Sequence, residues 1–242
     1  MNKFYTITKA TDLPINQNVK PYKIRKNEAS GLILHCTASE TATSKEVATW
    51  HTTPGKNNHL SKYGAPEIAY HFFINKSGVI EKTLLLDKIS WHAGGFNTNN
   101  LGVVLQYSGY KELPLEQYRA TICLLSHLIL GASLSTRGNP LTPDDIRGHR
   151  ELLGTGFRLL GGGKKALMKV CPGLMINLDS LRKDMAFETQ RLLKDKSLYL
   201  GRIDGIWGPL TKRAARQWYP LNSNLEKVVE TNGQYSLTYL GD

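Results

Sequence analysis

Segments with strand character alternate with helical patterns through the first 135 residues, and this alternation limits the fold more than any other feature. The apolar runs are short and rich in β-branched and aromatic residues, as is typical of buried strands; they cover residues 31–36, 68–74, 79–85 and 101–107. The second and third runs flank Gly78, which predicts a hairpin. Apolar residues within 115–133 recur at steps of three and four, which predicts a helix. We therefore expect an α/β fold in which helices flank a mixed central β-sheet.

A smaller unit follows the Pro172–Gly173 pair. Residues 180–194 show an amphipathic helical pattern, and a glycine-rich loop, GRIDGIWG, follows them. A second helix is expected to start at Pro209, because the first turn of a helix tolerates proline. Residues 222–242 show no strong pattern and leave either a hairpin or a tail open. We predict a first domain over 1–176 and a small all-α domain over 177–242, with its core at about 180–219.

Composition and charge narrow the class of protein. The chain has 242 residues, three cysteines and a formal net charge of +11. Three cysteines are too few for a disulfide scaffold, and no apolar run approaches the roughly 18 residues that would cross a membrane. The first 15 residues lack the apolar stretch of a secretory signal. The positive charge indicates an anionic partner, which nucleic acid, an anionic cell envelope or an acidic polymer would satisfy equally.

Three residues form a candidate metal site. His35, His149 and Cys171 offer two imidazoles and a thiolate, a set that suits Zn²⁺ and leaves the fourth position for water. That arrangement is typical of a catalytic site rather than a structural one. The three residues lie far apart in the sequence, however, so spacing alone leaves a second interpretation open. They could be a core histidine, a histidine at a helix start and a buried thiol.

Neighbouring residues add detail to the candidate site. His35 ends an apolar strand, and alternation along that strand points Cys36 to the opposite face. Lys169 precedes Cys171 by two residues, so extended backbone would place its cation beside the metal, where it could stabilise an oxyanion. Tyr70 and His71 also point to opposite faces, one to the core and one to a cleft. Periodicity does not decide between them.

Six short motifs occur in a fixed order along residues 28–176: HCTAS, AYHFFINKSG, WHAG, NNLGVVLQ, GHRE and KVCPG. In this order they resemble the zinc N-acetylmuramoyl-L-alanine amidases, a family that includes the small phage amidase lysozymes and the peptidoglycan recognition proteins. The resemblance implies that three side chains bind one Zn²⁺: His35, His149 and Cys171. It implies that Tyr70 and Lys169 are the catalytic side chains, and that His71 belongs to the core.

The resemblance also distinguishes between branches of the family. The cytoplasmic recycling amidases place a catalytic Glu where this chain has Val104, and an Asp ligand where it has Cys171. The phage-lysozyme-like branch is therefore favoured, with Tyr70 in the role of the Glu. His92, in the WHAG motif, and Asn100 are candidate substrate contacts. His51 and His59 are expected at the surface, and the role of the insert at 152–168 stays open.

The second domain resembles the three-helix peptidoglycan-binding domain found on many wall hydrolases. Residues 188–218, ETQRLLKDKSLYLGRIDGIWGPLTKRAARQW, carry the matching pattern. A helical cap that only packs on the first domain is the alternative. Because the resemblances of both domains imply the same polymer, we expect bacterial peptidoglycan as the partner. We expect neither nucleic-acid binding nor membrane insertion. A monomer is expected, although no sequence feature specifies the oligomeric state.

The expected activity is hydrolysis of the amide between N-acetylmuramic acid and the L-alanine of the stem peptide. Without a signal peptide, the protein would be made in the bacterial cytoplasm and reach the wall by release or by another export system, as a phage endolysin or a wall-attacking effector. A non-catalytic peptidoglycan receptor of the same fold is the main alternative. A nucleic-acid binder lacks a recognisable motif here. A wall glycosidase would need two placed carboxylates, which no local context singles out.

Overall fold

A seven-stranded mixed β-sheet forms the centre of the molecule, as the alternating pattern predicts. The computed structural model describes residues 3–131, 140–152, 170–218 and 234–239. Its sheet has the order β8-β3-β7-β4-β5-β1-β9. The strands are β1 (Lys3–Lys9), β3 (Gly31–Cys36), β4 (Phe72–Ile74), β5 (Ile80–Lys82), β7 (Asn100–Leu105), β8 (Ile146–Gly148) and β9 (Gln234–Tyr239). A second, two-stranded sheet pairs β2 (Lys23–Ile24) with β6 (Lys88–Ile89).

Most strand pairs are parallel, and the exceptions are local or terminal. β3 runs parallel to both β7 and β8, β7 to β4, and β1 to β5. The predicted hairpin is the antiparallel β4–β5 pair, whose turn places Gly78 at φ +83°, a conformation that L side chains rarely adopt. The other antiparallel pair of the seven-stranded sheet joins β9 to β1. Residues 234–239, for which the sequence left a hairpin or a tail open, are thus a strand at the edge of the sheet.

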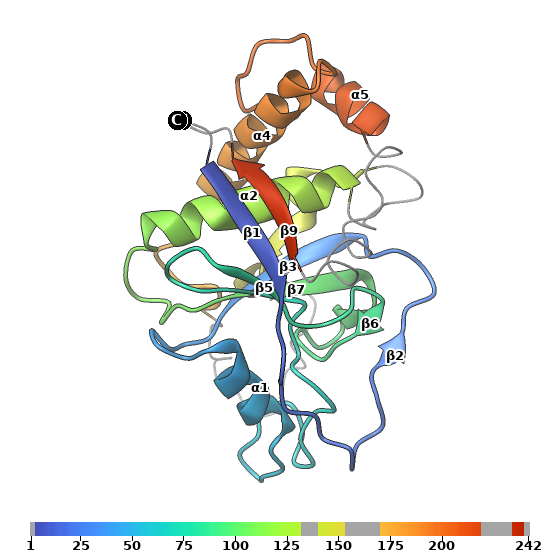
Figure 1. Cartoon of the computed structure of the whole chain (residues 1–242), viewed down its shortest axis with the longest axis vertical. Helices are drawn as coiled ribbons and strands as arrows, with labels where there is room; N and C mark the ends of the chain where they lie inside the picture. The colour runs from blue at the N-terminus through green and yellow to red at the C-terminus, as the bar shows by residue number, and fades with distance from the viewer. Residues whose placement is uncertain (1–2, 132–139, 153–169, 219–233, 240–242) are drawn as a thin grey trace, which may run out of the picture.

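Helices cover both faces of the sheet (Figure 1). They are α1 (Ser44–Thr52), α2 (Leu115–Gly131), α4 (Leu178–Asp195) and α5 (Pro209–Trp218), with short 3-10 turns at Asn97–Asn99, Pro143–Asp145 and His149–Leu152. α2 lies across one face, with α4 and α5 beyond it, while α1 lies on the other side (Figure 1). Thr43 caps α1 in a reciprocal capping box with Glu46. Among the described residues, no helix combines the length and apolar character needed to cross a bilayer.

Strand alternation decides which side chains meet which helix. Leu32 and Leu34 of β3 point to the α2 face and join the main core. Ile33 and His35 alternate with them and therefore point to the opposite face. Phe73 of β4 and Val104 of β7 also point there, packing with Val47 and Ala48 of α1. The candidate metal ligand His35 consequently lies on the α1 side of the sheet.

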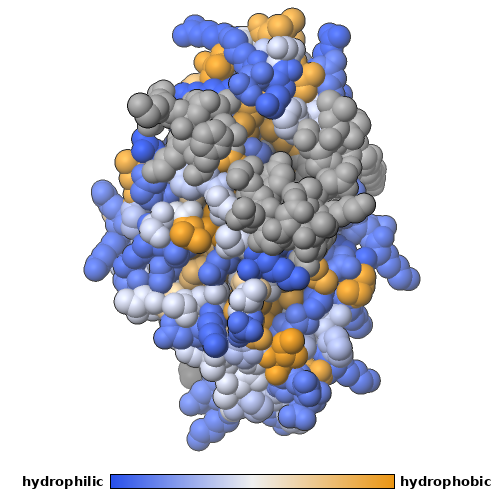
Figure 2. Space-filling view, in the orientation of Figure 1, coloured by the Kyte–Doolittle hydropathy of each residue, from blue (hydrophilic) through white to orange (hydrophobic). Residues whose placement is uncertain are grey.

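The C-terminal helices share contacts with the main core. Leu181 and Met185, in the first half of α4, belong to the core cluster formed with α2. Further along, Leu192 and Leu193 pack with α5 and with Leu130 in a separate cluster. The division of the chain at residue 176 stays a prediction. Most of the described surface in the view of Figure 2 is hydrophilic, with apolar side chains in small separate patches.

Candidate metal centre

The parallel pairing of β3 with β8 brings His35 and His149 together. Leu34 lies opposite Gly148 in the register, so His35, the next residue of β3, lies level with His149, which follows the last residue of β8. The two imidazole centroids are 4.6 Å apart. Cys171 completes the group, with its Sγ 3.7 Å from His35 Nδ1. One ligand atom from each of the three residues lies within 4.8 Å of the others.

Backbone contacts fix the position of Cys171. The Cys36 N–H donates to Cys171 Sγ at 3.2 Å, and the Arg150 N–H donates to the Cys171 carbonyl at 2.7 Å. An N–H aimed at sulfur stabilises the thiolate form, which is the form that binds metal. Arg150 also donates from its guanidinium to the carbonyls of Gly173 and Ile176, which holds the segment after Cys171.

The three side chains fit a zinc ion of the catalytic type. Two imidazoles and one thiolate are donors that Zn²⁺ prefers, and a fourth position would remain for water. His35 is buried at 1% exposure, whereas His149 and Cys171 are half-buried and keep some exposed surface. Within the described ranges, this is the one cluster of three or more histidine, cysteine or acidic side chains arranged to hold a metal ion.

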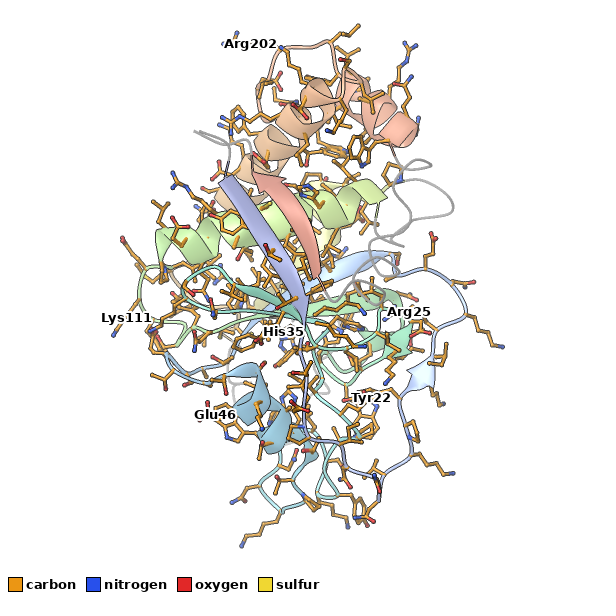
Figure 3. The ribbon with its side chains drawn as sticks, in the orientation of Figure 1. Tyr22, Arg25, His35, Glu46, Lys111 and Arg202 are labelled. Atoms are coloured by element: carbon orange, nitrogen blue, oxygen red, sulfur yellow. The ribbon has the colours of Figure 1, made fainter. Side chains whose placement is uncertain are left out.

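Tyr70 lies beside the cluster. The centroid of the Tyr70 ring is 5.0 Å from that of His35 and 5.3 Å from that of His51. The Tyr70 side chain is half-buried. Figure 3 shows His35 near the middle of the molecule. Burial, and then the neighbouring thiols of Cys171 and Cys36, raise the pKa of the Tyr70 phenol far above its usual range. The phenol therefore stays protonated and can donate a hydrogen bond.

His71 is the core histidine of the Tyr70–His71 pair. It has no exposed surface. The Gly102 N–H donates to its Nδ1 at 3.0 Å, so Nε2 carries the proton and donates to the Lys88 carbonyl, also at 3.0 Å. Burial lowers the pKa of His71 well below its usual range, so the ring stays neutral. Its hydrogen bonds join the hairpin to β7 and leave neither ring nitrogen for catalysis.

The two candidate substrate contacts, His92 and Asn100, bond to the protein. His92 is 6% exposed, and its ring nitrogens lie 3.0 Å from His35 Nε2 and 3.2 Å from the Asn100 carbonyl. Burial lowers the pKa of His92 to about 3. The side-chain amide of Asn100 donates to the Phe96 carbonyl at 2.8 Å. These contacts favour an internal role, and substrate contact by either residue stays a prediction.

Two further sequence expectations have different outcomes. Lys169 and residues 153–168 of the insert lie outside the described residues.

The expectation that His51 lies at the surface is wrong, because His51 is 2% exposed and its Nδ1 accepts the Ala69 N–H at 3.0 Å. Helical spacing could have indicated this, since His51 follows the buried Val47 by four residues on α1. His59 is exposed, as expected.

Comparison with known proteins gives the family. The sequence profile described as N-acetylmuramoyl-L-alanine amidase matches residues 25–174. The endolysin of Klebsiella phage KP32 is 26% identical over 84 residues, which are 34% of this chain and 50% of that protein. The endolysin of Enterobacteria phage K11 matches to the same extent. The chain therefore spans about half the length of the curated relatives that it matches.

Solved structures share the fold at low sequence identity. N-acetylmuramoyl-L-alanine amidase LysC from Clostridium intestinale URNW has a TM-score of 0.51 at 17% identity, covering 72% of this chain and 93% of its own. A complex of tracheal cytotoxin with peptidoglycan recognition proteins LCa and LCx has a TM-score of 0.50 at 17% identity, covering 70% and 91%. This likeness establishes the fold alone. Because the family profile spans more than half of the sequence, the chain belongs to the N-acetylmuramoyl-L-alanine amidase family.

Proposed function

We propose that this chain is a zinc-dependent amidase that hydrolyses the bond between the lactyl group of N-acetylmuramic acid and the L-alanine of the peptidoglycan stem peptide. The observation that carries the proposal is the convergence of His35, His149 and Cys171 within 4.8 Å in a chain of the amidase family. These side chains would hold a single Zn²⁺. When bound, the ion supplies Lewis acidity, which polarises the lactyl carbonyl and makes water a stronger acid.

The protonated phenol of Tyr70 would assist at the reacting carbonyl. Its ring lies 5.0 Å from the ring of His35, and burial holds its pKa high, so it donates a hydrogen bond at neutral pH. Such a donor stabilises the oxyanion as charge develops. Lys169, two residues before Cys171 in the sequence, would add a positive charge to the same oxyanion. Its role rests on the family resemblance.

One pocket is large enough to hold part of a polymeric substrate, and none of the three proposed metal ligands lines it. It has a volume of about 660 Å³ and is lined in part by Trp91, the residue that precedes His92. Two tyrosines, Tyr22 and Tyr63, and the amide of Asn97 share this lining. Aromatic rings with a few polar groups are typical of ligand pockets, and they suit the sugar and peptide parts of peptidoglycan.

The bacterial wall is the proposed place of action. The phage relatives are named endolysins, and we propose first that this chain is a phage endolysin. An exported effector that attacks the wall would use the same chemistry. We propose that residues 177–242 help to bind the wall. The non-catalytic receptor is the second candidate, because recognition proteins share the fold. The complete ligand set with Tyr70 beside it favours the enzyme, since a receptor needs no open metal site.

Digestion of purified peptidoglycan tests the proposal. The soluble products would be identified by mass spectrometry with intact protein, after chelation, and after zinc is restored. We expect free stem peptides with an unblocked L-alanine amine, which disappear on chelation and return with zinc. Disaccharide-peptides would instead identify a glycosidase. Absence of products while the protein sediments with the wall would identify the receptor.

A further inference from the structure

We propose that His92 is a positioning residue of the metal centre, which holds His35 in the one tautomer that can bind a metal ion through Nδ1. The proposal rests on the proposed zinc site, and it goes beyond that site by assigning a role to a side chain outside the ligand set. The evidence for the proposal is a chain of two hydrogen bonds that connects three groups: the Asn100 carbonyl, the His92 ring and the His35 ring.

The direction of each hydrogen bond follows from the first acceptor. A carbonyl oxygen only accepts, so His92 Nε2, 3.2 Å from the Asn100 carbonyl, carries the proton. A neutral imidazole has one N–H, and His92 Nδ1 is therefore an acceptor. His35 Nε2 lies 3.0 Å from that nitrogen and must donate to it. This leaves the Nδ1 of His35 without a proton.

The unprotonated nitrogen faces the other proposed ligands. His35 Nδ1 lies 3.7 Å from Cys171 Sγ, and the His35 ring packs 4.6 Å from the ring of His149. Only an unprotonated imidazole nitrogen binds a metal ion. In the opposite tautomer, the Nδ1–H of His35 would point at the metal position. The lone pair of His35 Nε2 would then face the lone pair of His92 Nδ1, and the two would repel each other. The chain of hydrogen bonds therefore favours the metal-binding tautomer of His35 in the metal-free protein.

The anchor of this chain of hydrogen bonds is rigid. The Asn100 carbonyl belongs to β7 and also accepts the Arg25 guanidinium at 3.3 Å, while the same guanidinium donates to the Lys88 carbonyl at 3.0 Å. The His92 ring lies against bare backbone at Gly102, where an added Cβ would come within 2.9 Å of His92 Cγ. Glycine at position 102 thus lets the ring pack on the sheet. His92 and His35 are both buried, so water does not compete for these bonds.

A pair of substitutions separates hydrogen bonding from packing. Leucine and asparagine have the same branched shape, but only the amide oxygen of asparagine can accept the His35 N–H. We expect His92→Leu to weaken Zn²⁺ affinity by about 10–100-fold, the range seen when a partner of a metal-bound histidine is lost. We expect His92→Asn to bind zinc within a few-fold of wild type. Affinity is measured by competition with a chromophoric chelator, and circular dichroism of the metal-free variants reports their folding.

Equal zinc affinity in wild type and a folded His92→Leu variant would overturn the proposal, as would a His92→Asn variant as weak as His92→Leu. Long-range ¹H–¹⁵N NMR of the metal-free wild type tests it without any variant. We expect His35 and His92 both to carry the proton on Nε2; a proton on His35 Nδ1 would refute it. A wild type that binds no zinc but shows these tautomers would refute the proposed metal site and leave the chain of hydrogen bonds intact.

Discussion

Cys171 contributes the anionic donor of the proposed ligand set, and its removal tests that set at the scale of one residue. We expect Cys171→Ala to lose stoichiometric zinc and to reduce amide hydrolysis to background, because two imidazoles alone form an incomplete site. Cys123→Ala is the matched control, since Cys123 is a buried free cysteine on α2, outside the cluster. Metal content is measured by atomic emission on dialysed protein. Stoichiometric zinc in Cys171→Ala would contradict the assignment.

Tyr70 is expected to act on rate rather than on metal binding. Tyr70→Phe removes only the phenolic hydroxyl, and loss of one oxyanion donor typically lowers kcat by about 10²–10³. Zinc content should be unchanged, because the phenol is not one of the three ligands. Single-turnover assays on a soluble muramyl-peptide, with metal analysis of the same samples, separate the two effects. A variant with wild-type turnover would remove Tyr70 from the mechanism.

At the scale of elements, Gln190 connects α4 to the loop that leads to α5. Its Oε1 accepts the N–H groups of Asp204 and Gly205, both at 2.9 Å, and its Nε2 lies 2.9 Å from the Ile206 carbonyl. The side chain has no exposed surface. This one amide therefore satisfies backbone groups of three consecutive loop residues, Asp204, Gly205 and Ile206.

Replacing Gln190 should destabilise the protein. Gln190→Leu leaves two backbone donors without their acceptor. An unsatisfied polar group costs about 1–3 kcal/mol when fully buried, and because Asp204 and Gly205 are half-buried, we expect a total loss in the lower part of the range for two groups, roughly 2–4 kcal/mol. Gln217→Leu makes the same chemical change at an exposed position of α5 and should be near neutral. Urea unfolding of both variants gives the difference. Equal stability of the two would show that the hydrogen bonds of Gln190 contribute nothing net.

Local patterns predicted most of these elements, but they could not predict which elements meet. The alternation of β-branched and aromatic residues identified β3, β4, β5 and β7, and the 3.6-residue period identified α2. His35 and His149 were candidate ligands by residue type, but only the family motifs favoured that interpretation, because their proximity depends on the non-local register of β3 with β8. β9 was left undecided for the same reason, since its pairing with β1 stabilises a strand whose own pattern is weak.

At the scale of the whole molecule, wholly or partly buried histidines that stay neutral make the free energy of unfolding depend on pH. Burial lowers the pKa of His51 to about 3 and that of His127 to about 4, and it holds the pKa of His71 well below the usual range. The unfolded chain would bind protons at these sites near pH 6.5, whereas the folded chain does not. Their contribution is therefore complete above pH 6.5 and is lost as pH falls towards the folded values.

Each such histidine lowers the free energy of unfolding by up to about 1.4 kcal/mol per pH unit below its unfolded pKa. We therefore expect a steep loss of stability between pH 6.5 and about pH 4. Urea unfolding in the presence of a chelator, which removes any contribution from bound metal, measures the slope. A flat profile between pH 7 and pH 5 would show that these rings accept protons in the folded protein. His127→Leu should make the slope shallower.

The pairing of β1 with β9 has a consequence for the order in which the chain is made. Lys3 lies opposite Tyr239 and Thr8 opposite Gln234, so two strands that pair with each other are synthesised at well-separated times. At about 5–20 residues per second, the outer edge of β1 stays uncovered for roughly 10–45 s of synthesis. A circular permutant that joins the two strands through a short turn would place them next to each other in time as well as in space, and it should expose that edge only briefly.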